Sequence, residues 1–206
     1  TAASKGLAFN SSANGFETSS STSMVLIKTL TASSDSTLSF VDGSSSVVLD
    51  NTYPVYMFKF FNIHPATDES DLQFNLSTDS GSNYNVTKTS TMFKGQHDES
   101  DSVTDVSYDG GGDLAQGTGY QNLTTNTGSD NDQSCSGTLT LFNPSSTTFV
   151  KHFIAIFNNL ANNDRCRNSY VAGYGNTTSA IDAISFKFDS GNIDAGTIKL
   201  YGIKDS

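Results

Sequence analysis

Leu72-Gln73-Phe74-Asn75-Leu76-Ser77 is the stretch that decides the fold class, because apolar and polar residues alternate along it without interruption. Successive side chains of a β-strand point to opposite faces, so this alternation predicts a strand with one buried face. Ile184-Ser185-Phe186-Lys187-Phe188-Asp189 repeats the pattern. Together the two stretches predict antiparallel sheet that packs on a core through one face and meets polar surroundings on the other.

Two longer runs carry apolar residues at both odd and even positions. They are Tyr53–Ile63, with Phe58, Phe60 and Phe61, and Thr148–Phe157. Runs of this kind are typical of strands that are covered on both sides. We therefore predict that these two strands are buried on both faces.

Further strands and turns surround these runs. Asn143-Pro144-Ser145-Ser146 separates two apolar stretches and predicts a hairpin connection, and Asp42-Gly43 predicts a turn. Many short strands joined by Gly, Asn and Ser turns predict an all-β protein, an antiparallel β-sandwich of jelly-roll type. An immunoglobulin-type sandwich is disfavoured because the chain has no Trp for its core. The remaining predicted strands are Met24–Leu30, Val47–Leu49, Tyr84–Phe93, Thr138–Phe142 and Thr197–Ile203.

A long acidic insertion, Gly95–Ser134, interrupts the sandwich pattern. It is rich in Gly, holds few apolar residues and contains no Lys or Arg. Its composition predicts an exposed, mobile segment, with a weak hairpin signal over Ser102–Tyr108. The acidic residues of the insertion are Asp98, Glu99, Asp101, Asp105, Asp109, Asp113, Asp130 and Asp132.

The N-terminal segment, residues 1–23, differs from the rest. Ser, Thr, Ala, Asn and Gly dominate it, and Leu7, Phe9 and Phe16 are its apolar anchors. We predict an N-terminal arm over 1–23 that contacts a neighbouring subunit through these three residues, and a single sandwich domain over 24–206 that contains the insertion 95–134. The first residues lack a basic segment followed by an apolar run, so no signal peptide is expected in this sequence.

Composition and charge exclude several classes of protein. The 206 residues carry 21 Asp and Glu against 11 Lys and Arg, a net charge of −10. So acidic a chain lacks the basic patch that binds nucleic acid or an anionic membrane. Apolar runs such as Phe153–Phe157 are far too short to cross a bilayer. A charged fraction of 16% is too low for a coiled coil.

No motif for catalysis, cofactor binding or metal binding stands out, and we expect a protein that is not an enzyme. The cluster Asp98-Glu99-Ser100-Asp101 has oxygen ligands for Ca²⁺ but lacks the EF-hand spacing, so a solvated loop is favoured. His64, His97 and His152 lack the spacing of a zinc site. Cys135 and Cys166 allow one disulfide, although two unpaired thiols are favoured.

Four tyrosines lie in polar stretches flanked by glycine: Tyr108, Tyr120, Tyr170 and Tyr174. Tyrosines exposed on loops can recognise sugars or proteins, because the ring is apolar and the hydroxyl forms hydrogen bonds. Packing of these rings against their own domain is the alternative, and the absence of Trp weakens a sugar platform. The four residues are therefore candidate recognition residues.

Three stretches resemble one known family. They are Asn62–Asp68, Leu141–Thr148 and Gly191–Ile203, and the last ends in Leu200-Tyr201-Gly202-Ile203. They are similar to small β-rich virion structural proteins of tailed bacteriophages. The resemblance extends in patches from Asn62 to Ile203, and it carries no catalytic residues.

What the resemblance implies is a capsid-surface decoration, cement or shell protein on the virion surface. Its partners would be itself, as a homotrimer, and other virion proteins. The alternative is a tail-fibre or receptor-binding module that recognises a host surface glycan. An adhesive carbohydrate-binding domain and a glycan hydrolase are the remaining alternatives. Copy number in the particle distinguishes a shell protein from a tail protein.

Overall fold

The computed structural model describes residues 6–9, 12, 14–19 and 23–204, and these residues form fourteen β-strands and no helix. The described part therefore contains no helix that could cross a membrane. Neighbouring strands run antiparallel throughout, which confirms the predicted all-β, antiparallel class. The strands are β1 (Gly6–Phe9), β2 (Phe16–Ser19), β3 (Met24–Thr31), β4 (Leu38–Val41), β5 (Val55–Pro65), β6 (Leu72–Ser77), β7 (Lys88–Asp98), β8 (Thr104–Tyr108), β9 (Gln121–Asn122), β10 (Cys135–Phe142), β11 (Lys151–Ala161), β12 (Arg165–Gly175), β13 (Ala183–Phe188) and β14 (Ile193–Ile203).

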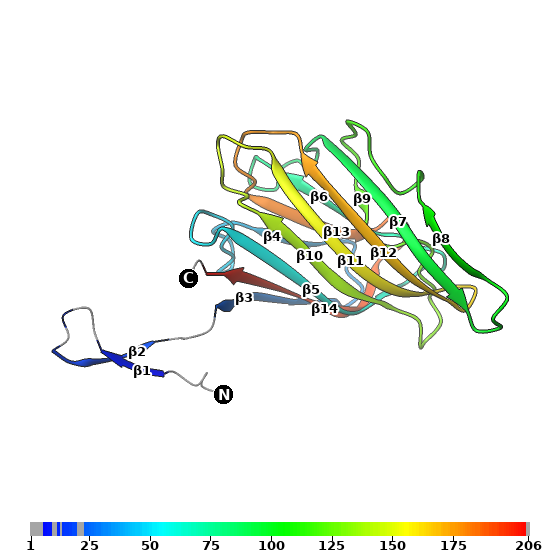
Figure 1. Cartoon of the computed structure of the whole chain (residues 1–206), viewed down its shortest axis with the longest axis horizontal. Coiled ribbons are helices and arrows are strands. Elements are labelled where there is room, and N and C mark those ends of the chain that lie inside the picture. The colour runs from blue at the N-terminus through cyan, green and yellow to red at the C-terminus, as the bar shows by residue number, and fades with distance from the viewer. Residues whose placement is uncertain (1–5, 10–11, 13, 20–22, 205–206) are drawn as a thin grey trace.

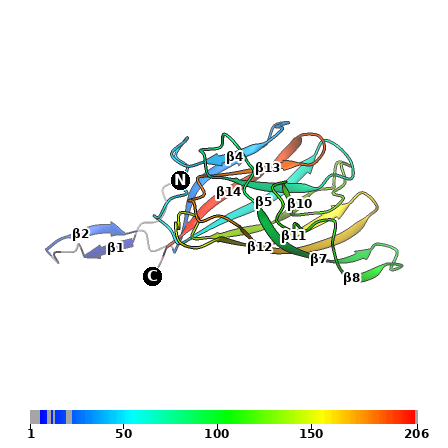
Figure 2. The ribbon, with the colours of Figure 1, turned by 90° about the horizontal axis from the view of Figure 1, so that it is seen from above.

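Two sheets face each other and make the sandwich (Figures 1 and 2). The larger sheet has eight strands in the order β3-β14-β5-β10-β11-β12-β7-β8. The smaller sheet has four, in the order β4-β13-β6-β9. The larger sheet has twice as many strands and is the broader layer of the molecule. One of its faces packs against the smaller sheet, and its other face, the second face, is not covered by the smaller sheet.

Aromatic side chains from both sheets fill the core. The ring of Phe186 on β13 meets Phe58 and Phe60 of β5 edge to face, with centroids 5.4 and 5.0 Å apart. Phe74 of β6 meets Phe153 of β11 in the same way at 5.0 Å. Edge-to-face contacts suit the charge distribution of aromatic rings and add to the free energy gained by burying their area. These contacts join the two sheets across the interior.

Both alternating stretches form strands, as predicted, and the structure makes them neighbours in the smaller sheet. The prediction that only one face is buried is wrong, because the polar Asn75, Ser77 and Ser185 are buried as well. Phe186 lies opposite Phe74, and Ile184 lies opposite Leu76. All four side chains are fully buried. The predicted hairpin is also confirmed, because β10 and β11 pair with each other, although the connection covers residues 143–150 and is longer than Asn143-Pro144-Ser145-Ser146. Asn143 takes a positive φ of 44°, a conformation that Asn tolerates better than most residues.

The prediction that two strands are buried on both faces is wrong. Along β11 the odd-numbered side chains are buried and most even-numbered ones are exposed, among them Ile154 at 50% and Ile156 at 43%. β5 likewise buries one face, apart from a change of parity at Asn62. The apolar residues on the second face of these strands therefore lie at the surface of the molecule.

Val47–Leu49 is not a strand, contrary to the prediction. The segment is a loop after β4 whose Val47 and Leu49 side chains are buried in the core. The Asp42 carboxylate accepts a hydrogen bond from the Leu49 backbone at 2.8 Å, which fixes the loop without a strand partner. Alternation of buried residues over so short a segment does not distinguish a strand from an anchored loop.

The acidic insertion divides into two parts. In its first part, β8 pairs with the end of β7 as an exposed hairpin, and Val106 is 77% exposed. In its second part, Gln121 and Leu123 are fully buried, and β9 joins the smaller sheet beside β6. The predicted exposure of Gly95–Ser134 therefore holds for the hairpin and is wrong for the second part, which packs into the sandwich.

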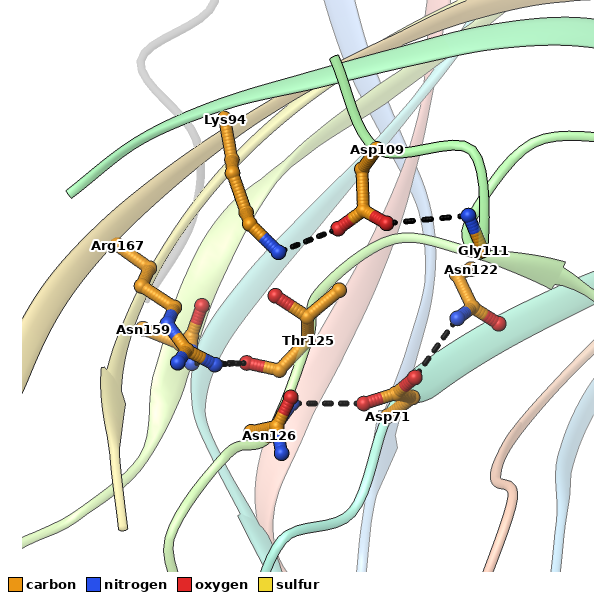
Figure 3. A network of polar contacts seen from close by, with 9 residues as sticks. All are labelled: Asp71, Lys94, Asp109, Gly111, Asn122, Thr125, Asn126, Asn159 and Arg167. Atoms are coloured by element: carbon orange, nitrogen blue, oxygen red, sulfur yellow. Dashed lines mark hydrogen bonds and ion pairs between the residues drawn. The ribbon is translucent and has the colours of Figure 1, made fainter. Parts of the chain in front are cut away.

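A polar network holds this second part in place (Figure 3). The Asp71 carboxylate, just before β6, accepts hydrogen bonds from the Asn126 backbone and the Asn122 side chain, both at 2.7 Å. Burial raises the pKa of Asp71 to about 6, although the bond from Asn126 opposes that shift. On the other side, Arg167 of β12 donates to the Thr125 carbonyl at 3.0 Å. Polar contacts thus supplement Leu123, the buried apolar residue of this segment, in holding it against the sandwich.

The register between β5 and β14 shifts where both strands bulge. Asn62 on β5 has a φ of 47°, and its backbone amide donates to the Ser136 hydroxyl of β10 at 3.0 Å. Opposite it, Gly196 on β14 has a φ of 115°, which side chains of L-residues rarely allow. The bulge changes which side of β5 faces the core, so that Ile63 is buried like Phe60.

Candidate functional site

The second face of the eight-stranded sheet is the candidate functional site. We call it the outer face and define it by three rows of residues that lie side by side across the strands, each of them exposed or half-buried. The first row is Tyr108, Phe93, Tyr170, Ile156, Thr138, Lys59, Lys199 and Thr29. The second is Thr91, Ala172, Ile154, Thr140, Met57, Tyr201 and Leu26. The third contains Thr89, Tyr174, His152, Phe142, Val55, Ile203 and Met24.

No acidic residue occurs in these three rows, although the chain contains 21. The charged residues in the rows are Lys59 and Lys199, neighbours on β5 and β14. Their ammonium groups lie over aromatic rings, Lys59 over Tyr201 at 5.6 Å and Lys199 over Phe61 at 5.3 Å. The excess negative charge of the protein therefore lies on its other surfaces, and the outer face is neutral to weakly basic.

A stacked pair of aromatic rings stands in the first row. Phe93 of β7 and Tyr170 of β12 are directly opposite each other, with ring centroids 4.9 Å apart and planes inclined by only 6°. The rings remain 44% and 38% exposed. Tyr108 of β8 lies on the other side of Phe93 in the register, so three aromatic residues follow one another across the sheet. They make a flat apolar surface that faces away from the core.

A hollow lies beside the stack. Its volume is about 490 Å³, and Thr89, Thr91, His152, Ile154 and Tyr174 surround the small residues Ala172 and Gly173. A smaller hollow of about 210 Å³ shares Thr91, Ile154 and Ala172 and extends to the stacked rings. The surface is recessed here because the side chain of Ala172 is smaller than those of its neighbours across the sheet, Ile154 and Thr91. The outer face thus has a raised stack next to a depression.

The structure brings three of the four candidate tyrosines together on the outer face. Tyr108 and Tyr170 flank Phe93, and Tyr174 borders the hollow beside His152. Tyr120 lies elsewhere, where Lys187 of the smaller sheet approaches its ring at 4.7 Å. Sequence reasoning missed Ile154 and Ile156 because it predicted that their strand is buried on both faces. It missed Phe93 because the predicted strand Tyr84–Phe93 was assigned no exposed face.

The predicted arm contains a small sheet of its own. β1 and β2 pair with each other, with Phe9 opposite Phe16 and Leu7 opposite Thr18, and form a separate two-stranded sheet. The side chains of Leu7, Phe9 and Phe16 lie outside the described part of the chain. Their predicted role in a contact between subunits therefore stays a prediction.

Other candidate residues have structural roles. Asp98 ends β7, and its carboxylate accepts hydrogen bonds from the Ser102 hydroxyl and from the Val103 and Ser102 backbone amides, the latter two at 3.0 and 2.8 Å. These bonds, the hydroxyl's first, lower the pKa of Asp98 and shape the turn to β8. Cys135 and Cys166 are both free thiols, the first buried and the second exposed. Among the described residues, no three or more His, Cys, Asp or Glu side chains gather as a metal site requires.

Lys88 is the most unusual titratable residue of the interior. It begins β7, is fully buried, and its ammonium group donates to the Val86 carbonyl at 2.8 Å and to the side-chain oxygen of Asn75. Burial lowers the pKa of Lys88 to about 7, because the charged form loses its hydration. The lysine links β7 to β6 at the end of the sandwich, away from the outer face.

This burial predicts how stability depends on pH. The pKa of Lys88 lies below the value of about 10.4 for an unfolded chain, so between these values the unfolded chain holds a proton that the folded chain has released. The contribution of Lys88 to the free energy of unfolding therefore rises with pH from about 7 to about 10, by up to about 1.4 kcal/mol per pH unit. The substitution Lys88→Met removes this pH-dependent contribution to the free energy of unfolding.

Urea unfolding of both proteins at neutral and at alkaline pH measures this effect. We expect the native protein to gain stability relative to Lys88→Met as the pH rises. Parallel changes in the two proteins would show that Lys88 keeps its proton in the folded state.

Comparisons of the chain with protein-family models, with curated proteins and with solved structures give no match. The function is therefore inferred from the outer face and from the sequence.

Proposed function

We propose that the chain is a non-enzymatic structural protein of a tailed-bacteriophage virion, a decoration, cement or shell component at the capsid surface. The observation that carries the proposal is the outer face: a broad apolar surface without acidic residues on a chain of net charge −10. Soluble monomers rarely expose large continuous apolar surfaces, and such surfaces mark contacts with other proteins. The resemblance of the sequence to virion proteins indicates that these contacts are made within a virion.

The course of the chain supports a jelly-roll sandwich, the architecture of many capsid proteins. From β3 to β7 each strand lies in the opposite sheet to the one before, and the same holds from β12 to β14. Repeated crossing between two sheets is characteristic of jelly rolls, whereas hairpin meanders stay in one sheet. In this protein β10, β11 and β12 form such a meander and widen the larger sheet.

The proposed partners are other copies of the chain and other virion proteins. The resemblance implies a homotrimer, with the arm of residues 1–23 as one of its contacts. An acidic exterior around a neutral contact surface keeps copies apart except through that surface, and it disfavours adhesion to DNA.

Counting copies in purified virions tests the proposal. A quantitative gel or mass-spectrometric measurement is expected to find the protein at a copy number comparable to that of the major capsid protein. A few tens of copies or fewer would place it in the tail instead. Complete absence from purified particles would overturn the proposal.

A second function is favoured by one specific observation. The stacked rings of Phe93 and Tyr170 form a flat exposed platform beside a hollow that is bordered by the Thr89, Thr91 and Tyr174 side chains. Sugar rings stack on aromatic faces while hydroxyl groups fix their orientation, so a receptor-binding module for host glycans fits this geometry. Glycan-array binding that is lost in Tyr170→Ala and kept in Phe149→Ala would support it.

A further inference from the structure

We infer that the outer face pairs with the outer face of a second copy, across the five neighbouring strands β10, β11, β12, β7 and β8. This inference rests on the proposed function, since it names the occupant of the proposed assembly surface, and it gives that surface a twofold dimer in place of the homotrimer that the resemblance implies. In these five strands the three rows of the outer face hold aromatic, aliphatic, Thr and His residues and neither Asp, Glu, Lys nor Arg.

Shape complementarity favours a second copy over an unrelated partner. The raised stack of Phe93 and Tyr170 and the hollow over Ala172 lie next to each other along β12 and β7. Consider a twofold axis that lies between the two sheets, runs perpendicular to the strands and passes midway between stack and hollow. Rotation about this axis places the stack of each copy over the hollow of the other. Twofold contacts require such a surface, one that is complementary to itself.

Charge favours the same arrangement. Each copy carries a net charge of −10, so most surfaces of two copies repel each other at close range. That repulsion is weakest over the five-strand region, because its rows contain no carboxylate and, among the described residues, only Tyr108 at its edge donates a hydrogen bond to one, that of Asp113. Lys59 and Lys199 lie beyond β10, outside the region. Contact at this region is therefore the approach of two copies that meets the least electrostatic opposition.

The area fits a weak, reversible pair. Five strands spaced about 4.8 Å apart span roughly 24 Å, and the three rows cover five residues along a strand, about 17 Å. Each copy then contributes roughly 400 Å², and the pair about 800 Å², a size typical of transient contacts rather than of stable complexes. Two sheets that stack in this way lie about 10 Å apart.

Sedimentation of the full-length protein over a range of concentrations tests the inference. We expect a monomer–dimer equilibrium that Ile154→Asp weakens by about tenfold or more, since a carboxylate would face the apolar centre of the partner. Ala172→Gln, which fills the hollow with a polar side chain, is expected to have a similar effect without altering the core. Phe149→Asp is the matched control, because Phe149 is 69% exposed and lies outside the three rows.

Cross-linking locates the contact independently. Ala172 lies close to the proposed axis, so Ala172→Cys in a Cys166→Ser background brings two thiols together across the interface. The sheet spacing of about 10 Å is too long for a disulfide but suits a short bis-maleimide. We expect a covalent dimer from Ala172→Cys and none from a cysteine at position 149 in the same background.

The outcomes separate this inference from the proposed function. A protein that stays monomeric at high concentration overturns the inference, as does a trimer or dimer that Ile154→Asp and Ala172→Gln leave unchanged. Far-UV circular dichroism of the variants shows that they remain folded, so that a loss of association is not mistaken for unfolding. A high copy number in virions without a dimer in solution would support the proposed function and overturn the inference. A dimer in solution of a protein that is absent from virions would support the inference and overturn the proposed function.

Discussion

Phe74→Asp is expected to prevent folding of the sandwich. Phe74 is fully buried in β6, and its ring meets Phe153 of the opposite sheet at 5.0 Å. Loss of a buried Phe costs about 3–5 kcal/mol. Burying an unpaired carboxylate in its place costs several kcal/mol more. The sum is comparable to the whole stability of a typical domain, about 5–15 kcal/mol.

Far-UV circular dichroism and gel filtration measure the effect of Phe74→Asp. The spectrum is expected to lose its β-sheet character and the protein to elute as an expanded chain. Phe149→Asp is the matched control, since the same substitution there introduces a carboxylate at an exposed position. A folded Phe74→Asp variant with native thermal stability would contradict the core described above.

Gly196→Ala is the second substitution with a large expected effect. A Cβ atom at Gly196 would lie 2.5 Å from the Asn62 carbonyl oxygen and 2.8 Å from the Ile63 Cα. The φ of 115° is also strained for any residue with a side chain. Since the obstacle is backbone, β5 and β14 must separate at the bulge, and we expect a loss of about 3 kcal/mol or more in the free energy of unfolding.

Urea unfolding compares Gly196→Ala with Gly119→Ala. A Cβ at Gly119 meets no atom within 4 Å, and Gly119 does not have a positive φ, so this control is expected to be neutral or slightly stabilising. Equal stabilities of the two variants would show that the bulge adapts without cost.

The sequence predicted strands well where one face is apolar and the other polar. Leu72–Ser77 and the Ile184 to Phe188 stretch needed no other information, because period-two alternation has no competing explanation there. The same principle failed at Ile154 and Ile156. Periodicity records which side chains are apolar, but it does not record whether another layer of the protein covers them.

The candidate site was only partly predictable for the same reason. Tyr108, Tyr170 and Tyr174 were selected for their polar, glycine-flanked surroundings, and the register of β8, β12 and β7 then placed them on one face. The register also added Phe93, whose partner Tyr170 is 77 positions away in the chain. Contacts at such separations come from the pairing of strands, which local sequence does not encode.

The packing of Gln121 and Leu123 was missed because the segment around them is polar. Its anchors include a hydrogen bond from the Asn126 amide to Asp71 and one from Arg167 to the Thr125 carbonyl, whose partners lie more than 40 positions apart in the sequence. Composition rules weigh apolar residues and net charge, so a segment held by buried polar contacts is assigned to the solvent.

The position of β14 has a consequence for biosynthesis. This final strand lies between β3 and β5, and Thr197 near its middle pairs with both Thr31 and Phe61. A ribosome releases β14 after the other strands of the larger sheet, so that sheet stays divided until residues 193–203 have emerged. Until then β3 has no strand to pair with in that sheet, and one edge of β5 remains open. Nascent chains that have not yet released β14 thus expose unpaired strand edges that can pair with one another and aggregate.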